Sequence, residues 1–441
     1  MKTRIPPALA FVVLAAAPVS AQDARDLTVD ESVRLGLERN ARLQAAEADA
    51  SAATAVLRQA RAGRLPTLSA QADYTRLSDN IPNVTFTVPG TDSTVTFQNI
   101  ELDQVQGELR EQQTLFTGSR LGNRVRAAEH EERAADLRAE QERADVAFEI
   151  RQAYWELYRA RAVRESLAGA LERVEAHLSE VQARVGEGTA LRRDLLAART
   201  RRSEVELERL EAENAVRVGE LELNRRIGMP LDTPVRPASE VEIDTAEASL
   251  DTLAAVALAQ RPELIAARED VAGLEAQVRA SRGEWWPQVD FVGRYLYARP
   301  NPYFFLDQTR FRGSWELGFS TRWPLWEGGR RSARTAELRA RLEAARARLT
   351  EARLQVSVEV ARQQLEVVRA RQAVAVAAQN VSEAEESFRV VRAQFAEGVA
   401  LSSDVLDAEE AYRQAEERSG RSRADYAVAR AALLNGLGRV W

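Results

Sequence analysis

Two long stretches of the chain carry an apolar residue at every seventh position, with charged residues in between. Within 167–185 the apolar positions step by four and three: Leu167, Leu171, Val174, Leu178, Val181 and Val185. Within 374–395 the seven-residue step recurs at Val374, Val381, Phe388 and Phe395. This spacing is typical of helices that pack together as coiled coils. No proline interrupts residues 119–186, so the pattern predicts one helix of roughly 100 Å.

Other stretches alternate apolar and polar residues with a period of two, which indicates strands with two unlike faces. Two of them place these residues on one face: Val289, Phe291, Tyr295 and Tyr297, and then Trp315, Leu317, Phe319 and Trp323. A third stretch, from Leu68 to Tyr74, alternates in the same way, whereas the stretch 102–116 alternates poorly. We therefore expect two β-hairpins, at about 66–116 and about 287–325.

The same elements occur twice along the chain. Pro66 aligns with Pro287 at an offset of 221 residues, and "LFTGSR" from 115 aligns with "LWEGGR" from 325 at an offset of 210. Residues 22–228 are expected to form a first repeat, 229–249 a linker and 250–441 a second repeat. Each repeat is predicted to contain a helix, a hairpin, a long helix, a glycine elbow and a return helix. The elbows are expected near 188 and 398.

The ends of the first helices carry recognisable capping residues. Thr28 and Glu31 have capping-box spacing, and Ser249 takes the place of Thr28 in the second repeat. After the second elbow, Ser402 is expected to cap the return helix, with Leu401 and Leu406 as a hydrophobic staple. Arg192, which is a poor cap, takes the corresponding place in the first repeat.

Residues 1–21 have the composition of a secretory signal peptide. Lys2 and Arg4 precede an apolar run from Ala8 to Val19, and small residues lead to a predicted cleavage after Ala21. The apolar run is too short to span a bilayer, and no later stretch has 18 consecutive apolar residues. The sequence therefore predicts an exported protein without a helical membrane anchor.

Composition argues against catalysis. The chain has no cysteine and only two histidines, His130 and His177, which are expected on solvated helix faces. No phosphate-binding glycine loop and no metal-ligand spacing is present, so we expect neither an enzyme nor a bound metal or cofactor. The net charge of −6 argues against a nucleic acid partner.

Four strands of about ten residues on an exported chain suit an outer-membrane β-barrel, since ten tilted residues cross the hydrocarbon layer. Four tryptophans gather at one end of the second hairpin and are expected at the membrane interface: Trp285, Trp286, Trp323 and Trp326. Four strands cannot close a barrel and open edges are not tolerated in lipid, so a membrane-inserted chain must oligomerise. An amphipathic sheet on a soluble core, or a periplasmic coiled-coil protein without a channel, remains an alternative.

Three stretches resemble the outer membrane efflux protein family, the TolC-type outer membrane channels. They are "PLWEGGRRSARTAELRA", "RPELIAAREDVAGLEAQVRASRGEWWPQVDF" and "FAEGVALSSDVLDAEEAYRQAEERSGRSRADYAVARAALLNGLG". The resemblance implies an α+β membrane protein in the outer membrane: a homotrimer whose twelve-stranded β-barrel continues into a long periplasmic α-helical barrel. The linker 229–249 would then lie in an equatorial layer.

The resemblance also implies an exit duct of a tripartite efflux pump or a type I secretion system. Its partners would be outer membrane lipid, a periplasmic adaptor and an inner-membrane transporter of the RND or ABC type. Members of the family carry drugs, metal ions or proteins, and the sequence does not choose among these cargoes.

Both elbows are expected at the end of the columns far from the hairpins. The resemblance places a periplasmic constriction there, at Asp404 and Asp407, with Asp194 in the first repeat and Phe395 in the place of a gate tyrosine. Asp404 and Asp194 could equally serve only to complement a helix dipole. The elbow surfaces are the expected docking sites for the adaptor, unless they form turns alone: Gly188, Thr189, Leu191, Arg192, Gly398, Val399, Leu401 and Ser402.

Overall fold

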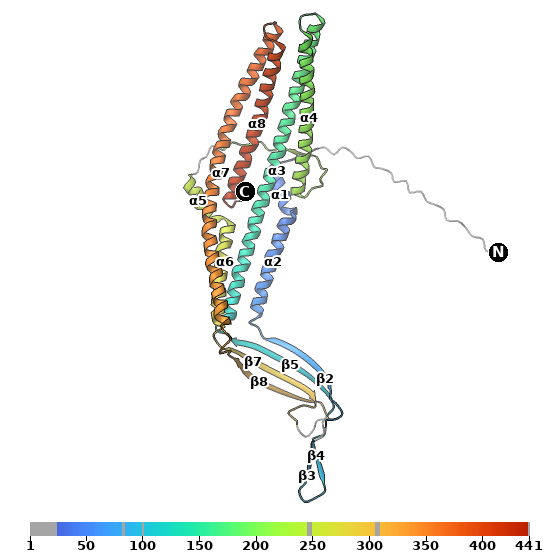
Figure 1. Cartoon of the computed structure of the whole chain (residues 1–441), viewed down its shortest axis with the longest axis vertical. Coiled ribbons are helices and arrows are strands. Elements are labelled where there is room, and N and C mark those ends of the chain that lie inside the picture. Colours follow the sequence, from blue (N-terminus) through green and yellow to red (C-terminus); the bar gives the residue numbers. More distant parts are fainter. Residues whose placement is uncertain (1–23, 82–83, 99–100, 245–248, 305–308, 440–441) are drawn as a thin grey trace, which may run out of the picture.

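The computed structural model describes residues 24–81, 84–98, 101–244, 249–304 and 309–439. The predicted signal peptide lies outside these residues. The chain forms a tall bundle of helices with a curved sheet at one end (Figure 1).

Four helical columns make up the tall part (Figure 1). Two columns are continuous helices of 67 residues each, α3 (Arg120–Gly186) and α7 (Arg330–Ala396). The other two are interrupted, α2 (Ala41–Ala62) with α4 (Arg192–Ile227), and α6 (Pro262–Gly283) with α8 (Ser402–Gly436). The short helices α1 (Val29–Arg39) and α5 (Leu250–Gln260) lead into α2 and α6. Of the four columns, α3 lies between the α2/α4 column and the α6/α8 column, and α7 lies at one side.

The predicted caps of the first helices are confirmed. The Glu31 backbone N–H donates to Thr28 Oγ1 over 3.2 Å, and the Thr28 N–H donates back to the Glu31 carboxylate over 3.0 Å. Ser249 caps α5 by accepting from the Thr252 N–H over 3.2 Å. Each cap satisfies a backbone donor that the first helical turn leaves without a partner.

The sheet contains one antiparallel layer in the order β2-β5-β7-β8. Its strands are β2 (Thr67–Arg76), β5 (Asp103–Phe116), β7 (Gln288–Arg299) and β8 (Arg312–Arg322). The poorly alternating stretch is a strand of 14 residues, and it pairs on both sides, with β2 and with β7. The β5–β7 pairing joins the two repeats into one sheet. Both outer strands, β2 and β8, have an edge without a partner within the described residues.

Two smaller sheets accompany this layer. Between β2 and β5, a hairpin of β3 (Val84–Thr87) and β4 (Thr94–Gln98) extends the tip that lies farthest from the helices. β1 (Arg25–Leu27) pairs in parallel with β6 (Val235–Pro237).

The largest apolar core lies around the midpoint of α3. Tyr154 is fully buried there, donates through its hydroxyl to the Leu27 carbonyl over 2.9 Å and accepts from the Ser239 N–H over 2.8 Å. On α8, the Tyr426 hydroxyl accepts from the Asp244 N–H over 2.9 Å. Two buried tyrosines thus fasten the inter-repeat linker to the middle of the columns. Within the described residues, no helix combines the length and the apolar character needed to cross a membrane.

Candidate functional site

The two faces of the sheet differ sharply. On one face the large apolar side chains of β8 stand out into solvent, with Trp315 74% and Phe319 73% exposed. The register of the strands places four more exposed apolar or aromatic residues on this face: Leu68, Tyr74, Tyr295 and Tyr297. Apolar side chains of this size are seldom exposed together unless another surface or lipid covers them.

The opposite face is polar and internally paired. The Arg294 guanidinium lies between Glu108, at 2.9 Å, and Glu316, at 3.3 Å. Nearer the helices, the Asp290 carboxylate is buried and accepts from the Thr114 hydroxyl over 2.7 Å. An apolar face backed by a polar one is the arrangement of a strand between lipid and a water-filled lumen.

The four predicted interface tryptophans lie where the strands join the helices. All four are exposed, Trp326 most of all at 86%. The Trp323 indole N–H donates to the Trp285 carbonyl over 3.1 Å, and the Arg331 guanidinium lies 5.7 Å from the Trp285 ring centre. Exposed indoles at one end of an apolar strand surface have the placement of a membrane-interface girdle.

The two elbows lie at the other end of the columns, farthest from the sheet (Figure 1). Gly188 and Gly398 adopt left-handed backbone angles, with φ of 77° and 79°. In the first elbow the Thr189 N–H donates to the Arg184 carbonyl over 2.8 Å, and in the second the Val399 N–H donates to the Gln394 carbonyl over 2.9 Å. Only glycine adopts this backbone conformation freely, so each elbow ends its long helix in the same way.

The predicted caps of the return helices are wrong by one residue. Leu191 and Leu401 are the N-cap residues, and Arg192 and Ser402 are already helical. The leucine side chains have no acceptor, so a carboxylate of the first turn substitutes. Asp194 accepts from the Leu191 N–H over 3.2 Å, and Asp404 accepts from the Leu401 N–H over 2.9 Å.

The predicted staple shifts with the cap. Leu401 is exposed, whereas Val405 is buried in an apolar cluster that also contains Ala400. Ser402, instead of capping, is buried and lies 2.7 Å from His177 Nε2.

The expectation of solvated histidines is also wrong. His177 is buried, its ring centre lies 5.0 Å from that of Phe395, and burial lowers the pKa of its imidazole. His130 is partly buried, with Nδ1 2.7 Å from the Glu269 carboxylate on α6. Both rings join α3 to the α6/α8 column.

The constriction residues of the sequence lie in two environments. Asp404 and Asp407 are exposed on one side of α8, and no hydrogen bond or ion pair joins Asp407 to any described residue. Phe395 is buried in the protomer, where it packs with Val181 and Val405 and carries the Arg184 guanidinium 4.5 Å above its ring. The carboxylates therefore reach solvent, while the ring holds the two helix pairs together at the tip.

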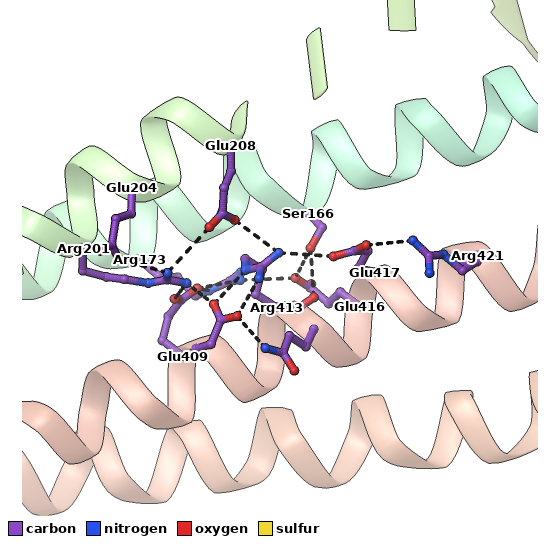
Figure 2. Close-up of polar contacts among 12 residues, drawn as sticks. Ser166, Arg173, Arg201, Glu204, Glu208, Glu409, Arg413, Glu416, Glu417 and Arg421 are labelled. Carbon is purple, nitrogen blue, oxygen red and sulfur yellow. Dashed lines mark hydrogen bonds and ion pairs between the residues drawn. The ribbon is translucent and has the colours of Figure 1, made fainter. Parts of the chain in front are cut away.

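About two turns into α8, a network of buried charges joins three helices (Figure 2). Glu409 is 2% exposed, and its carboxylate lies 3.3 Å from Arg173 of α3 and 3.9 Å from Arg201 of α4. Arg413 pairs with Glu410 at 2.6 Å and reaches Glu208 of α4 at 3.5 Å.

Burial and charge oppose each other within this network. Burial raises the pKa of Glu409, and the charges of Arg173 and Arg201 offset only part of that effect. Burial also acts on Glu410, but hydrogen bonds from Arg413 and Gln414 prevail and lower its pKa. The hydrogen bond to Glu410 is the main reason that the pKa of Arg413 is raised. A network of this kind is costly to break because each separated charge would remain buried without its partner.

This network was not among the sequence-based expectations, although α8 carries one signal of it. The buried positions Ser402, Val405 and Glu409 step by three and four, so Glu409 lies on the same face of α8 as the apolar Val405. A carboxylate on such a stripe indicates a buried partner of opposite charge.

Comparison with known proteins agrees with these features. The model of the outer membrane efflux protein family matches residues 33–229 and again 253–439. The chain belongs to the outer membrane efflux protein family. Membership places it in the outer membrane, and the family is one of efflux proteins rather than of enzymes.

Solved structures of outer membrane channels share the fold. VceC from Vibrio cholerae is 22% identical with a TM-score of 0.76, and the match covers 93% of this chain and 96% of VceC. MtrE from Neisseria gonorrhoeae, an outer membrane channel solved in its open state, is 18% identical with a TM-score of 0.76, over 93% of this chain and 89% of MtrE.

A curated relative is the proteases secretion protein PrtF of Dickeya chrysanthemi, 24% identical over 236 residues. That match covers 52% of this chain and 50% of PrtF, so it spans only half of each protein. The family is thus named for efflux, whereas this curated relative is named for secretion.

Proposed function

We propose that this outer membrane efflux protein is the exit duct of an efflux pump or a type I secretion system. Three copies form a barrel of twelve strands in the outer membrane, continuous with a helical barrel in the periplasm. The duct conducts its cargo passively, and an inner-membrane transporter of the RND or ABC type supplies the energy.

One observation carries the proposal. The four-stranded sheet has an exposed apolar face and a polar face, and β2 and β8 leave its two edges unpaired. A sheet with open edges is unstable in lipid because no water satisfies the edge N–H and carbonyl groups. Pairing β8 of one copy with β2 of the next closes the sheet and leaves the polar face around a lumen.

The exposed elbows supply the surface for a periplasmic adaptor. Leu191, Val399 and Leu401 are exposed apolar residues at the tips, although the elbow backbone needs only the glycines to turn. Exposed apolar side chains around a turn of fixed conformation are suited to a protein partner. The proposed docking residues are the exposed ones among those expected from the sequence: Gly188, Thr189, Leu191, Arg192, Gly398, Val399 and Leu401. Ser402 is buried against His177 and supports the second elbow from within.

The narrowest point of the duct is proposed at Asp404 and Asp407. Three copies place six carboxylates around the axis, where they favour cations. Asp194 and Phe395 act on the same tip from within, Asp194 through its cap on α4 and Phe395 through its packing between α3 and α8.

The two aspartates provide a test, because only Asp404 caps the helix. In planar bilayers, Asp407→Asn should raise single-channel conductance and weaken block by multivalent cations without a change in thermal stability. Asp404→Asn should change conductance too, and in addition lower stability by about 0.5–1 kcal/mol per chain through the lost charge at the helix terminus.

Glu366→Gln, which removes an exposed carboxylate from the middle of α7 where it pairs with Arg369, is the control and should leave conductance unchanged. A wild-type conductance in both aspartate variants would count against the constriction. A purified protein that forms no channel would count against the duct and favour a periplasmic coiled-coil protein without a channel.

A further inference from the structure

A cavity of about 300 Å³ lies where the strands meet the helices. Thr117 and Arg120 at the start of α3, Glu284 and Trp286 after α6, and the first turns of α7 form its walls together with Gln288 and Arg322 of the sheet. Five arginines line it, against two carboxylates. The cavity therefore has an excess of positive charge.

Both carboxylates, those of Glu327 and Glu284, already pair with arginines of α7. Glu327 accepts from Arg331 over 2.6 Å and also pairs with Arg330. Glu284 lies 3.9 Å from Arg334. Three of the five arginines thus share the two glutamates.

Arg120 and Arg322 are the remaining two. Arg120 donates to the side-chain oxygen of Gln288 over 2.7 Å, and its Nε is buried without a hydrogen-bond acceptor. Gln288 is also the cross-strand partner of Arg322, so this glutamine lies between the two arginines. Throughout the described part of the chain, no carboxylate forms an ion pair with either of them.

The nearby Asp290 does not neutralise this pair. Its carboxylate accepts from Gln288 Nε2 over 2.9 Å and from the Thr114 hydroxyl over 2.7 Å. These bonds turn the Gln288 oxygen toward Arg120. Just outside the cavity, burial lowers the pKa of Arg124, and the positive charge of Arg120 lowers it further.

Two helix termini add to the field. α3 begins at Arg120 and α7 at Arg330, each is 67 residues long, and neither N-cap residue contributes a side-chain cap. The N-terminus of a helix carries a partial positive charge and favours anions.

We propose that this cavity binds a phosphate group between Arg120 and Arg322. Guanidinium groups bind phosphate through paired hydrogen bonds, and the group would supply the acceptor that the buried Arg120 Nε lacks. The group has two possible sources. Arg322 and Gln288 project from the polar face of the sheet, which admits a phosphate-bearing solute, while Trp286 at the interface admits the headgroup of an anionic phospholipid. The site needs only the fold of one chain and does not depend on the proposed function.

The test is calorimetric titration of inorganic phosphate into the full-length protein in a neutral, phosphate-free detergent. Saturable binding is expected, and Arg322→Gln should weaken it roughly tenfold or more, as for the loss of a charge-assisted hydrogen bond. Arg120→Gln with Arg322→Gln should abolish it. The paired control Arg369→Gln with Arg389→Gln removes two exposed arginines of α7, each bound to a glutamate of its own helix, and should bind phosphate as the wild type does.

The source is found by repeating the titration in nanodiscs. If phosphatidylglycerol discs prevent the phosphate binding that is seen in detergent, the site holds a lipid headgroup. Undiminished binding in these discs assigns the site to a solute. Wild-type affinity in the Arg322→Gln variant, or equal losses in the control, would overturn the proposal.

Discussion

The two long helices are equal in length but differ in how they are buried. α3 buries residues along its whole length, because α2, α4, α6 and α8 surround it. α7 leaves a stripe of large apolar residues 61–69% exposed: Leu354, Val358, Leu365 and Val376. Their spacing of four, seven and eleven residues keeps them on one side of the helix. One helix is thus the interior of a wall and the other is its edge.

The opposite margin of the chain is an edge of the same kind. The α2/α4 column exposes Val56, Leu207, Leu210 and Val218, each at least 50% accessible. The unpaired strands β2 and β8 continue these two margins through the sheet. The chain is well packed in its middle but has exposed apolar helices and unpaired strands at both margins. A chain of this kind is one segment of a closed wall, so the comparison supports assembly of identical copies.

The largest effect is expected from charging the exposed stripe. In the assembly, the neighbouring copy would cover the exposed stripe of α7. Leu365→Asp combined with Val376→Asp would therefore bury carboxylates without partners at each contact between copies, at a cost of several kcal/mol for each site. The assembly should separate into monomers or fail to form, as measured by native mass spectrometry in detergent. Ala378→Asp, an exposed position on the other side of the same helix, should leave the mass unchanged. Intact assembly of the double variant would show that α7 is not an edge.

A smaller effect is expected inside the wall, where the charge network joins α8 to α3 and α4. Arg413→Met keeps the aliphatic stem but removes the partner of Glu410 and Glu208. The expected cost is about 1–2 kcal/mol in the stability of the tip, because both carboxylates are partly exposed and Glu410 keeps its contact with Arg201. Limited proteolysis should cut the elbows faster. Arg421→Met removes an exposed arginine that also pairs with Glu417, and its proteolysis should match that of the wild type. If both variants resist proteolysis equally well, the charge network does not stabilise the tip.

The smallest effect concerns acid. The unfolded chain protonates His177 below about pH 6.5, but burial lowers the pKa of the folded residue, so the unfolded form binds more protons and the tip loses stability as pH falls. Glu409 acts in the opposite direction, because its raised pKa stabilises the folded form as pH falls toward and below that value.

His177→Gln keeps a hydrogen-bonding side chain beside Ser402. It should abolish the part of the acid-induced loss of stability that comes from protonation of the histidine. Hydrogen exchange of the elbows at pH 7 and pH 5.5 measures the difference between the two proteins. An identical pH response in both would assign the acid effect to other groups.

Much of this architecture follows from local pattern. The seven-residue repeat, the elbow glycines and the two-faced strands are properties of one segment at a time, so the sequence displays them directly. β5 alternates poorly, and its pairing with β2 on one side and β7 on the other fixes its place where its own pattern does not.

The errors share one physical cause. His177, Ser402 and Glu409 look like ordinary polar helix residues until α3 and α8 are known to lie together. A periodic stripe shows which side of a helix is buried but not which helix covers it. The caps shifted because the Asp194 and Asp404 carboxylates, rather than the residues at the expected positions, satisfy the first backbone donors.

The most direct measurement is the mass of the protein extracted from outer membranes in mild detergent and kept unheated. The account predicts a complex of three chains, because one chain provides only four strands with two unpaired edges. A single chain, stable in water without detergent and recovered from the soluble periplasm, would contradict it.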